Sequence, residues 1–129
     1  MPEPRFLIDT NICIYLLEGM SPAARDRIEA LEPGEVVTSA ICCAEVMRGI
    51  DPANAGSLAK AEQLFNVIPV LDFSFAAAQR YARLAFRRHS FDRLIAAHAL
   101  ALNLVLVTNN ERDLMPIPGL KVENWTVAP

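Results

Sequence analysis

The chain has 129 residues, 53% of them hydrophobic, and a formal net charge of −3 at pH 7. A chain of this length can bury roughly two-thirds of its unfolded surface in one core, so we expect a single domain over residues 1–129. The negative charge argues against a protein that coats nucleic acid by electrostatic attraction alone. The apolar runs are too short to span a membrane, and the first residues lack the pattern of a secretion signal, so we expect a cytoplasmic protein.

Short apolar runs alternate with longer segments of helical periodicity, a pattern typical of repeated βα units around a mostly parallel sheet. Residues that favour helix starts stand before or within three of these segments: Asp9 or Thr10, then Pro22, then Ser39. In the first half of the chain we expect strands at 5–8, 36–38 and 67–71 and helices at 10–18, 22–31, 39–49 and 57–65.

The second half of the chain continues the same alternation. Residues 72–74 can cap a long helix that we expect to reach about Arg87. Residues 91–102 repeat apolar side chains at helical spacing, so this helix should be well buried. The run LVLVT at 104–108 is typical of a buried parallel strand, and we expect a loop with a helical turn at 109–114 and a last strand at 121–123. The fold class is therefore α/β.

Four acids follow apolar runs or lie on the first turns of helices: Asp9, Glu45, Asp92 and Asp113. Right-handed crossovers bring the carboxyl ends of parallel strands to one edge of a sheet, so we expect these acids to meet there. At an effective dielectric constant of about 20, two such charges about 5 Å apart repel by about 3 kcal/mol. The cluster therefore predicts a divalent cation, Mg²⁺ or Mn²⁺, and phosphodiester hydrolysis.

Each acid also has an ordinary structural explanation. Asp9 and Asp92 can be helix caps, Glu45 can be an exposed helical acid, and the segment around Asp113 can be a turn. Apolar neighbours on both sides of Glu45 make an idle charge there less favourable. Nearby polar side chains could orient a metal-bound water or complete the site: Thr10, Asn11, Thr108 and Asn110.

A basic segment extends over residues 79–93, and its only acid is Asp92. It is either a solvated helix face or a surface that binds phosphates of a nucleic acid. His89 belongs to this segment and could touch phosphate, whereas His98 is expected to point away from Asp92 and to be a core or rim residue. The candidate RNA-binding residues are Arg80, Arg83, Arg87, Arg88 and Arg93.

Four segments together resemble the PIN-domain family, and most closely the VapC-like ribonuclease toxins of bacterial type II toxin–antitoxin modules. They span nearly the whole domain, and their combination is more specific than any one of them. The segments are LIDTN at 7–11, AEVMRG at 44–49, FDRLIAAHAL at 91–100 and VTNNERDLMPIPGLKVENW at 107–125.

The resemblance implies a three-layer α/β/α fold and a Mg²⁺-dependent endoribonuclease, dimeric and held inactive by a VapB-like antitoxin. Asp9, Glu45 and Asp92 match the three invariant acids of the motif set. Family members place a fourth acid at the position of either Asn110 or Asp113, and we assign Asp113 as the acid and Asn110 as its polar neighbour. The chain departs from the family just before Asp92, where a shorter, basic RRHSFD replaces a Gly-containing loop.

The mechanism that we expect combines these residues with a metal ion, and a second ion that arrives with the substrate is left open as an alternative. Asp9 and Asp92 bind Mg²⁺ directly, and the ion keeps several waters. Glu45 and Asp113 hold or deprotonate one water, which attacks the phosphate. The arginines of the basic segment hold flanking phosphates, and the substrate is single-stranded RNA whose bases can be splayed out.

Other functions fit the sequence less well. A phosphoacceptor receiver domain would need a lysine after a late strand, and Lys60 and Lys121 are poorly placed for that role. A phosphatase with an aspartyl nucleophile would need an acid where Asn11 stands. The closest alternative is a PIN-type nuclease in RNA processing or DNA repair that has no antitoxin, and a domain that only binds a partner is the remaining one.

Overall fold

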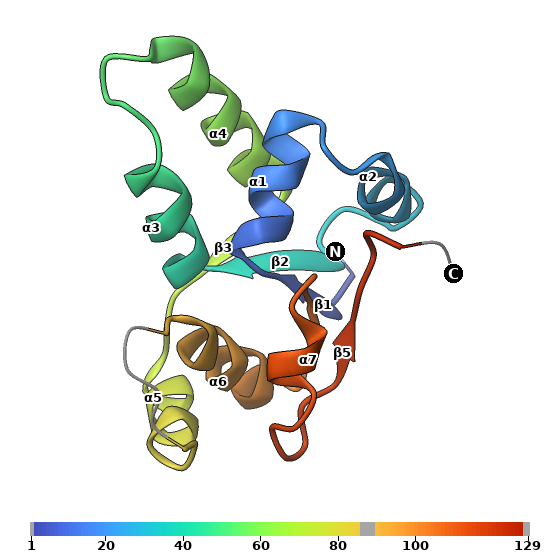
Figure 1. Cartoon of the computed structure of the whole chain (residues 1–129), viewed down its shortest axis with the longest axis vertical. Helices are drawn as coiled ribbons and strands as arrows, with labels where there is room; N and C mark the ends of the chain where they lie inside the picture. Colours follow the sequence, from blue (N-terminus) through green and yellow to red (C-terminus); the bar gives the residue numbers. More distant parts are fainter. Residues whose placement is uncertain (1, 86–89, 128–129) are drawn as a thin grey trace.

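Five parallel strands form the central sheet of the computed structural model, which describes residues 2–85 and 90–127. Their order is β3-β2-β1-β4-β5 (Figure 1), so the prediction of a mostly parallel sheet is confirmed. The strands are β1 (Phe6–Ile8), β2 (Val36–Ser39), β3 (Val70–Leu71), β4 (Val105–Val107) and β5 (Val122–Glu123).

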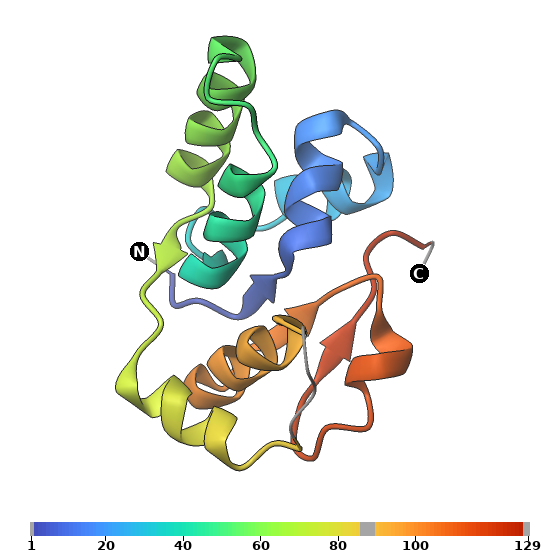
Figure 2. The ribbon, with the colours of Figure 1, turned by 60° about the vertical axis from the view of Figure 1, so that its left-hand side comes forward.

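Helices cover both faces of this sheet (Figures 1 and 2), and the predicted three-layer α/β/α architecture is confirmed. One face carries α1 (Thr10–Glu18), α2 (Pro22–Glu29), α3 (Ala40–Arg48) and α4 (Ala55–Val67). The other face carries α5 (Phe75–Ala82), α6 (Asp92–Leu102) and α7 (Glu111–Leu114). None of the helices in the described part of the chain is long and apolar enough to cross a membrane.

Strand β1 lies at the centre and contributes to two hydrophobic cores. Successive side chains of a strand point to opposite faces, so Phe6 and Ile8 pack against the α1–α4 layer and Leu7 packs against α6. All three residues are buried. The expected burial of the 91–102 helix is also confirmed, because residues 95–99 of α6 are buried against the second core.

Two element boundaries in the middle of the chain differ from the sequence prediction. Helix α4 starts at Ala55, two residues early, because the Asn54 side chain accepts a hydrogen bond of 3.0 Å from the Ser57 N–H. The same helix continues to Val67, so β3 is shorter than the expected 67–71. Pro69 has no N–H to donate, and its carbonyl accepts the Thr38 N–H at 3.0 Å just before β3 begins.

The long helix expected from residue 75 to about Arg87 is wrong in length, because α5 ends at Ala82. The N–H groups of Arg83 and Leu84 bond to carbonyls three residues back, at 3.1 and 3.0 Å, which tightens the chain into a turn. This turn lets Leu84 pack against the core beside α6. Residue 87 itself lies outside the described residues.

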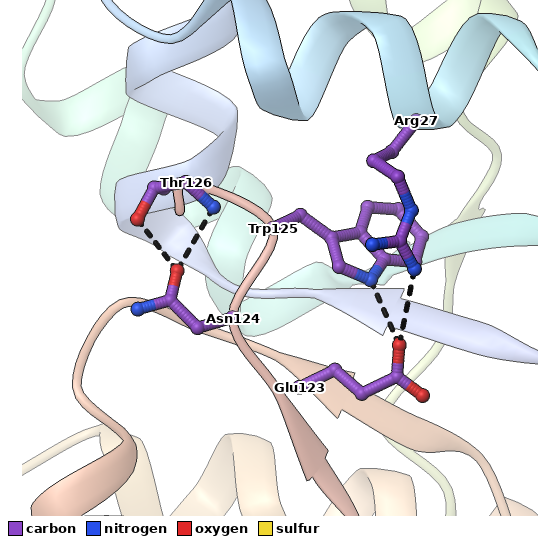
Figure 3. A network of polar contacts seen from close by, with 5 residues as sticks. All are labelled: Arg27, Glu123, Asn124, Trp125 and Thr126. Carbon is purple, nitrogen blue, oxygen red and sulfur yellow. Dashed lines mark hydrogen bonds and ion pairs between the residues drawn. The ribbon is translucent and has the colours of Figure 1, made fainter. Parts of the chain in front are cut away.

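A polar clasp joins the C-terminal segment to α2 (Figure 3). Trp125 is 1% exposed and packs edge-on against Phe6, with ring centroids 4.9 Å apart. Its indole N–H donates to a Glu123 carboxylate oxygen at 2.9 Å, and Arg27 donates to the same oxygen at 3.4 Å. The Arg27 guanidinium also lies over the indole ring, 5.1 Å from its centroid. The clasp therefore seals the core at the edge of β1.

We expect Arg27→Gln to lower the free energy of unfolding by about 1 kcal/mol, because the cation–π contact and one carboxylate contact are lost. Urea denaturation followed by the fluorescence of Trp125, the single tryptophan of the chain, measures this change. Arg25→Gln is the matched control on the same helix, where the pair with Glu29 is exposed and should contribute less than about 0.5 kcal/mol. Equal effects of the two substitutions would contradict a stabilising role for the clasp.

Candidate active site

The ends of the central strands lie level with one another at one edge of the sheet. Ile8 of β1 pairs with Thr38 of β2 and with Val107 of β4, so the residues that follow these three share one height. The chain leaves β1 into α1 on one face and β4 into α7 on the other, which makes the β1/β4 boundary a switch point of the sheet. Ligands of open α/β sheets bind at such points, outside the carboxyl ends of the strands.

Asp9 is the first side chain beyond β1 and is only 5% exposed. Its carboxylate caps α1 by accepting the Ile12 N–H at 3.0 Å, and its own N–H donates to the Val107 carbonyl at 3.0 Å. Burial raises the pKa of Asp9 to about 6; the Thr108 hydroxyl and the Ile12 N–H oppose this rise, and the charges of two other acids add to it. Those two acids are the predicted partners Asp92 and Glu45.

Glu45 reaches the site from α3, which packs beside α1. The Thr10 hydroxyl, on the first turn of α1, donates to a Glu45 carboxylate oxygen at 2.6 Å. Glu45 and Thr10 are both half-buried. The predicted supporting role of Thr10 therefore takes the form of a bond that fixes the Glu45 carboxylate.

Asn110 connects the remaining two acids. Its side-chain amide donates to a carboxylate oxygen of Asp92 and to one of Asp113, both at 3.3 Å, and its backbone N–H donates to the Thr108 hydroxyl at 2.9 Å. Asp92 is half-buried on the first turn of α6. Asp113 is exposed on α7, so it belongs to the rim of the site and joins it through Asn110.

Sequence reasoning missed a bracket of polar side chains beside the acids. Asn11 donates to the Asn109 side-chain carbonyl at 3.3 Å, and the Asn109 amide donates to the Tyr15 hydroxyl at 2.7 Å. The bracket ties the segment after β4 to α1. Its signal was the spacing of Asn11 and Tyr15, which puts the two residues on one face of a helix. That Asn11 orients a metal-bound water stays a prediction; in this structure its amide donates to Asn109.

The acids are close enough to interact but do not form a metal cage in the metal-free protein. Within residues 2–85 and 90–127, no three His, Cys, Asp or Glu side chains are arranged to ligate one ion. Each of the three inner acids is held by its own donor: the Ile12 N–H, the Thr10 hydroxyl and the Asn110 amide.

The donor set nevertheless fits a divalent cation. Among the described residues, the groups that shift the pKa of Asp9 include two carboxylates and no lysine or arginine, so none of these residues gives its charge a basic partner. Mg²⁺ prefers oxygen ligands, keeps several waters and is usually bound by only one or two carboxylates, so a complete cage is not required.

Of the predicted basic residues, Arg93 directly follows Asp92 in the chain, and Arg80 and Arg83 come from the α5 side of the sheet. Arg80 and Arg83 are exposed at the end of α5 and just beyond it, and Arg93 is half-buried on α6. His98 is buried, as expected, with its Nδ1 atom 2.8 Å from the Ser39 hydroxyl oxygen. The other candidates of the basic segment lie outside the described residues: Arg87, Arg88 and His89.

The chain is similar to known proteins along nearly its whole length. The family model "PIN domain" matches residues 6–115. The tRNA(fMet)-specific endonuclease VapC of Shigella flexneri is 34% identical over 131 residues, covering 95% of this chain and 98% of that protein. The DNA-bound VapBC structure from Salmonella typhimurium aligns with a TM-score of 0.84 and 30% identity, over 95% of this chain and 98% of that one. VapBC2 of Rickettsia felis, bound to a promoter DNA fragment, aligns with a TM-score of 0.81 and 28% identity, over 93% and 98%.

The raised pKa of Asp9 predicts how the stability of the metal-free protein depends on pH. Its contribution to folding is fully present below its unfolded pKa of 3.8 and is lost as the pH rises through about 6. The loss amounts to about 3 kcal/mol at neutral pH. Asp9→Asn keeps the helix cap and removes the charge, so we expect this variant to be more stable than the natural chain at pH 7.5, with the difference vanishing near pH 4. Urea denaturation at both pH values measures it.

Burial lowers the pKa of His98, so this residue also makes stability depend on pH. Because His98 is present in both proteins, its effect cancels when the natural chain is compared with Asp9→Asn. Mg²⁺ at pH 7.5 should raise the melting temperature of the natural chain and leave that of Asp9→Asn nearly unchanged. Parallel dependence of stability on pH and equal responses to Mg²⁺ in the two proteins would show that the Asp9 charge does not destabilise the fold.

Proposed function

Because the chain belongs to the PIN-domain family, we propose that it is a metal-dependent endoribonuclease of the toxin type that cuts RNA phosphodiester bonds. The observation that carries the proposal is the meeting of Asp9, Glu45 and Asp92 at the switch point, where no lysine or arginine in the described part of the chain is paired with the buried Asp9 charge. Relatives at this level of similarity are named as endonucleases and ribonucleases, which supports RNA as the substrate class. Initiator tRNA is the first substrate to test, because the Shigella flexneri relative is named for it.

In this proposal Asp9 and Asp92 hold one Mg²⁺ ion, and Mn²⁺ can substitute. When bound, the ion lowers the pKa of a water and offsets the charge that develops on the phosphate. Asp9 brings the charge that most needs a cation, because burial raises its pKa to about 6. Asp92 is held toward the site by the side-chain amide of Asn110, which donates to one of its carboxylate oxygens at 3.3 Å.

Glu45 and Asp113 are proposed to act on the attacking water. The Thr10 hydroxyl fixes one Glu45 oxygen, so this carboxylate is positioned to accept a proton as the water oxygen bonds to phosphorus. The bond from phosphorus to the leaving ribose oxygen breaks in the same displacement, and that oxygen takes a proton from solvent. Asp113 is exposed and bonded to Asn110, which suits it to orient water at the rim.

We further propose a VapB-like antitoxin as the partner of this chain, since the similar solved structures are VapBC complexes. A groove of about 670 Å³ between α1, α3 and α4 ends at Glu45. It combines apolar residues such as Leu17 and Val46 with the acids Glu18 and Asp51, so it would accept a segment that carries apolar and basic side chains. Exposed Phe75 and Phe91 support a homodimer as the state of the free chain.

Asp92→Asn should lower the rate of RNA cleavage at least about a hundredfold, because a metal ligand is lost, and Asp113→Asn about tenfold, because a water-orienting group is lost. Glu111→Gln is the matched control, an acid on the same short helix as Asp113 whose carboxylate faces Asn124. Cleavage of labelled RNA in Mg²⁺ measures all three, and unchanged melting temperatures show that the variants are folded. Full activity of Asp92→Asn would rule out the proposed chemistry.

The antitoxin is tested with the small protein encoded beside the gene for this chain. We expect the two proteins to purify together and cleavage to be suppressed in the complex, then restored when the partner is removed by proteolysis. If no neighbouring gene product binds and the free chain cuts RNA without harming its host, the alternative of a PIN-type nuclease in RNA processing or DNA repair is favoured.

A further inference from the structure

A basic groove lies on the face of the sheet opposite the α1–α4 layer. Residues of α5, α6 and the loop at 115–119 enclose about 520 Å³ of space. Its floor includes Leu84 and Leu100, and one wall is the rigid segment Pro116–Pro118. Three arginines line it, and no carboxylate does: Arg80, Arg83 and Arg93.

A second, smaller hollow of about 250 Å³ continues this groove. Arg80 and Leu100 line both, and the second hollow adds Lys121 and Gly119. Gly119 has a φ of +79°, a backbone conformation that turns the loop past Leu100 and that other residues rarely adopt. We call the cations along both hollows the α6 track: Arg93, Arg83, Arg80 and Lys121.

The charge of the α6 track is not neutralised by neighbouring acids. In the described residues, none of its four cations forms an ion pair, whereas Arg5, Arg25 and Arg27 do. The three hollows on the α1–α4 side are each lined by at least one carboxylate. A protein with a net charge of −3 therefore concentrates unpaired positive charge in one groove. Such a groove attracts and orients a polyanion.

The α6 track starts beside the candidate active site. Arg93 directly follows Asp92 on the first turn of α6, and Arg80 lines the hollow with Asn103, just past the other end of this helix. Helix α6 has 11 residues and so is about 16 Å long. A fully stacked strand, as in B-form DNA, carries one phosphate per about 3.4 Å of axis, so the track can face up to about five phosphates.

We propose that the α6 track binds the backbone phosphates of about five nucleotides on one side of the RNA bond that is cut. Guanidinium groups match phosphate oxygens with paired N–H donors, and three of the four cations are arginines. The line of charges leading away from Asp92 fits a strand that passes through the site better than it fits an acidic protein surface. The inference rests on the proposed ribonuclease function and adds where the substrate lies beyond the cut bond.

The test compares RNA binding by full-length variants that cannot cut. In an Asp9→Asn background, we would measure the dissociation constant of labelled single-stranded RNA at several salt concentrations by fluorescence anisotropy. Adding Arg80→Gln and Arg83→Gln should weaken binding about tenfold at about 0.1 M salt and lower the slope of log affinity against log salt by about 1.4. Both arginines are exposed, so the fold should be retained.

The matched control is Arg25→Gln with Arg48→Gln, which removes two exposed arginines from the α1–α4 side and should leave the salt slope unchanged. Removing five nucleotides from the flank that occupies the track should weaken binding more than about tenfold in the protein with intact arginines. The same removal should weaken binding less in the Arg80/Arg83 variant, where only Arg93 and Lys121 still face that flank. Both flanks of the cut site are shortened in turn to identify it.

Equal affinities and salt slopes for the Arg80/Arg83 variant and its control would overturn the inference, as would an absence of RNA binding in both. Unchanged RNA binding together with a weakened complex with the partner protein would assign the groove to an acidic protein instead. Cleavage by the natural chain separates this inference from the proposed function. If the natural chain cuts RNA and the variants bind equally, only the α6 track is refuted; if it cuts no RNA under any condition, the ribonuclease proposal itself fails.

Discussion

The carboxylate of Asp9 directly follows three residues that are buried on both faces of the sheet, and its backbone is bonded to the end of β4. A charge in such a position cannot move into solvent without disrupting the central strand. The surrounding structure lowers the cost only in part, through the Ile12 N–H and the Thr108 hydroxyl. This fixed, poorly solvated charge is what makes the switch point a place for a cation and the neighbouring acids a shared site.

The other acids are positioned by polar bonds that cross between layers. Thr10 on α1 holds Glu45 on α3, while Asn110 after β4 holds Asp92 on α6. These bonds keep the carboxylates apart while no cation is present. Together with the Asn109–Tyr15 bond, they connect α1 and the loop after β4 to the helices that carry the acids. A metal ion would therefore enter a site whose ligands are already oriented.

The alternation of short apolar runs and helical segments was enough to predict the parallel sheet, because strand and helix periodicities differ clearly along this chain. The order of the acids was enough to predict that Asp9, Glu45 and Asp92 interact. What could not be predicted depends on contacts between distant residues. The early end of α5 accompanies the packing of Leu84, and within residues 2–85 and 90–127 the acids have separate bonding partners and do not form a carboxylate cage. The α6 track depends on the loop at 115–119, which lines one groove together with Arg80 and Arg83, more than 30 residues earlier in the chain.

The clasp around Trp125 joins the two ends of the chain, because the last segment to be synthesised packs on the first strand. Every proposed catalytic side chain precedes Glu123 and Trp125, yet the indole ring covers Phe6, in the strand that presents Asp9. A nascent chain that has already emerged past Asp113 thus still lacks the lid on its first core. The strand that presents Asp9 therefore reaches its final packing only when the C-terminal segment that carries this tryptophan is in place.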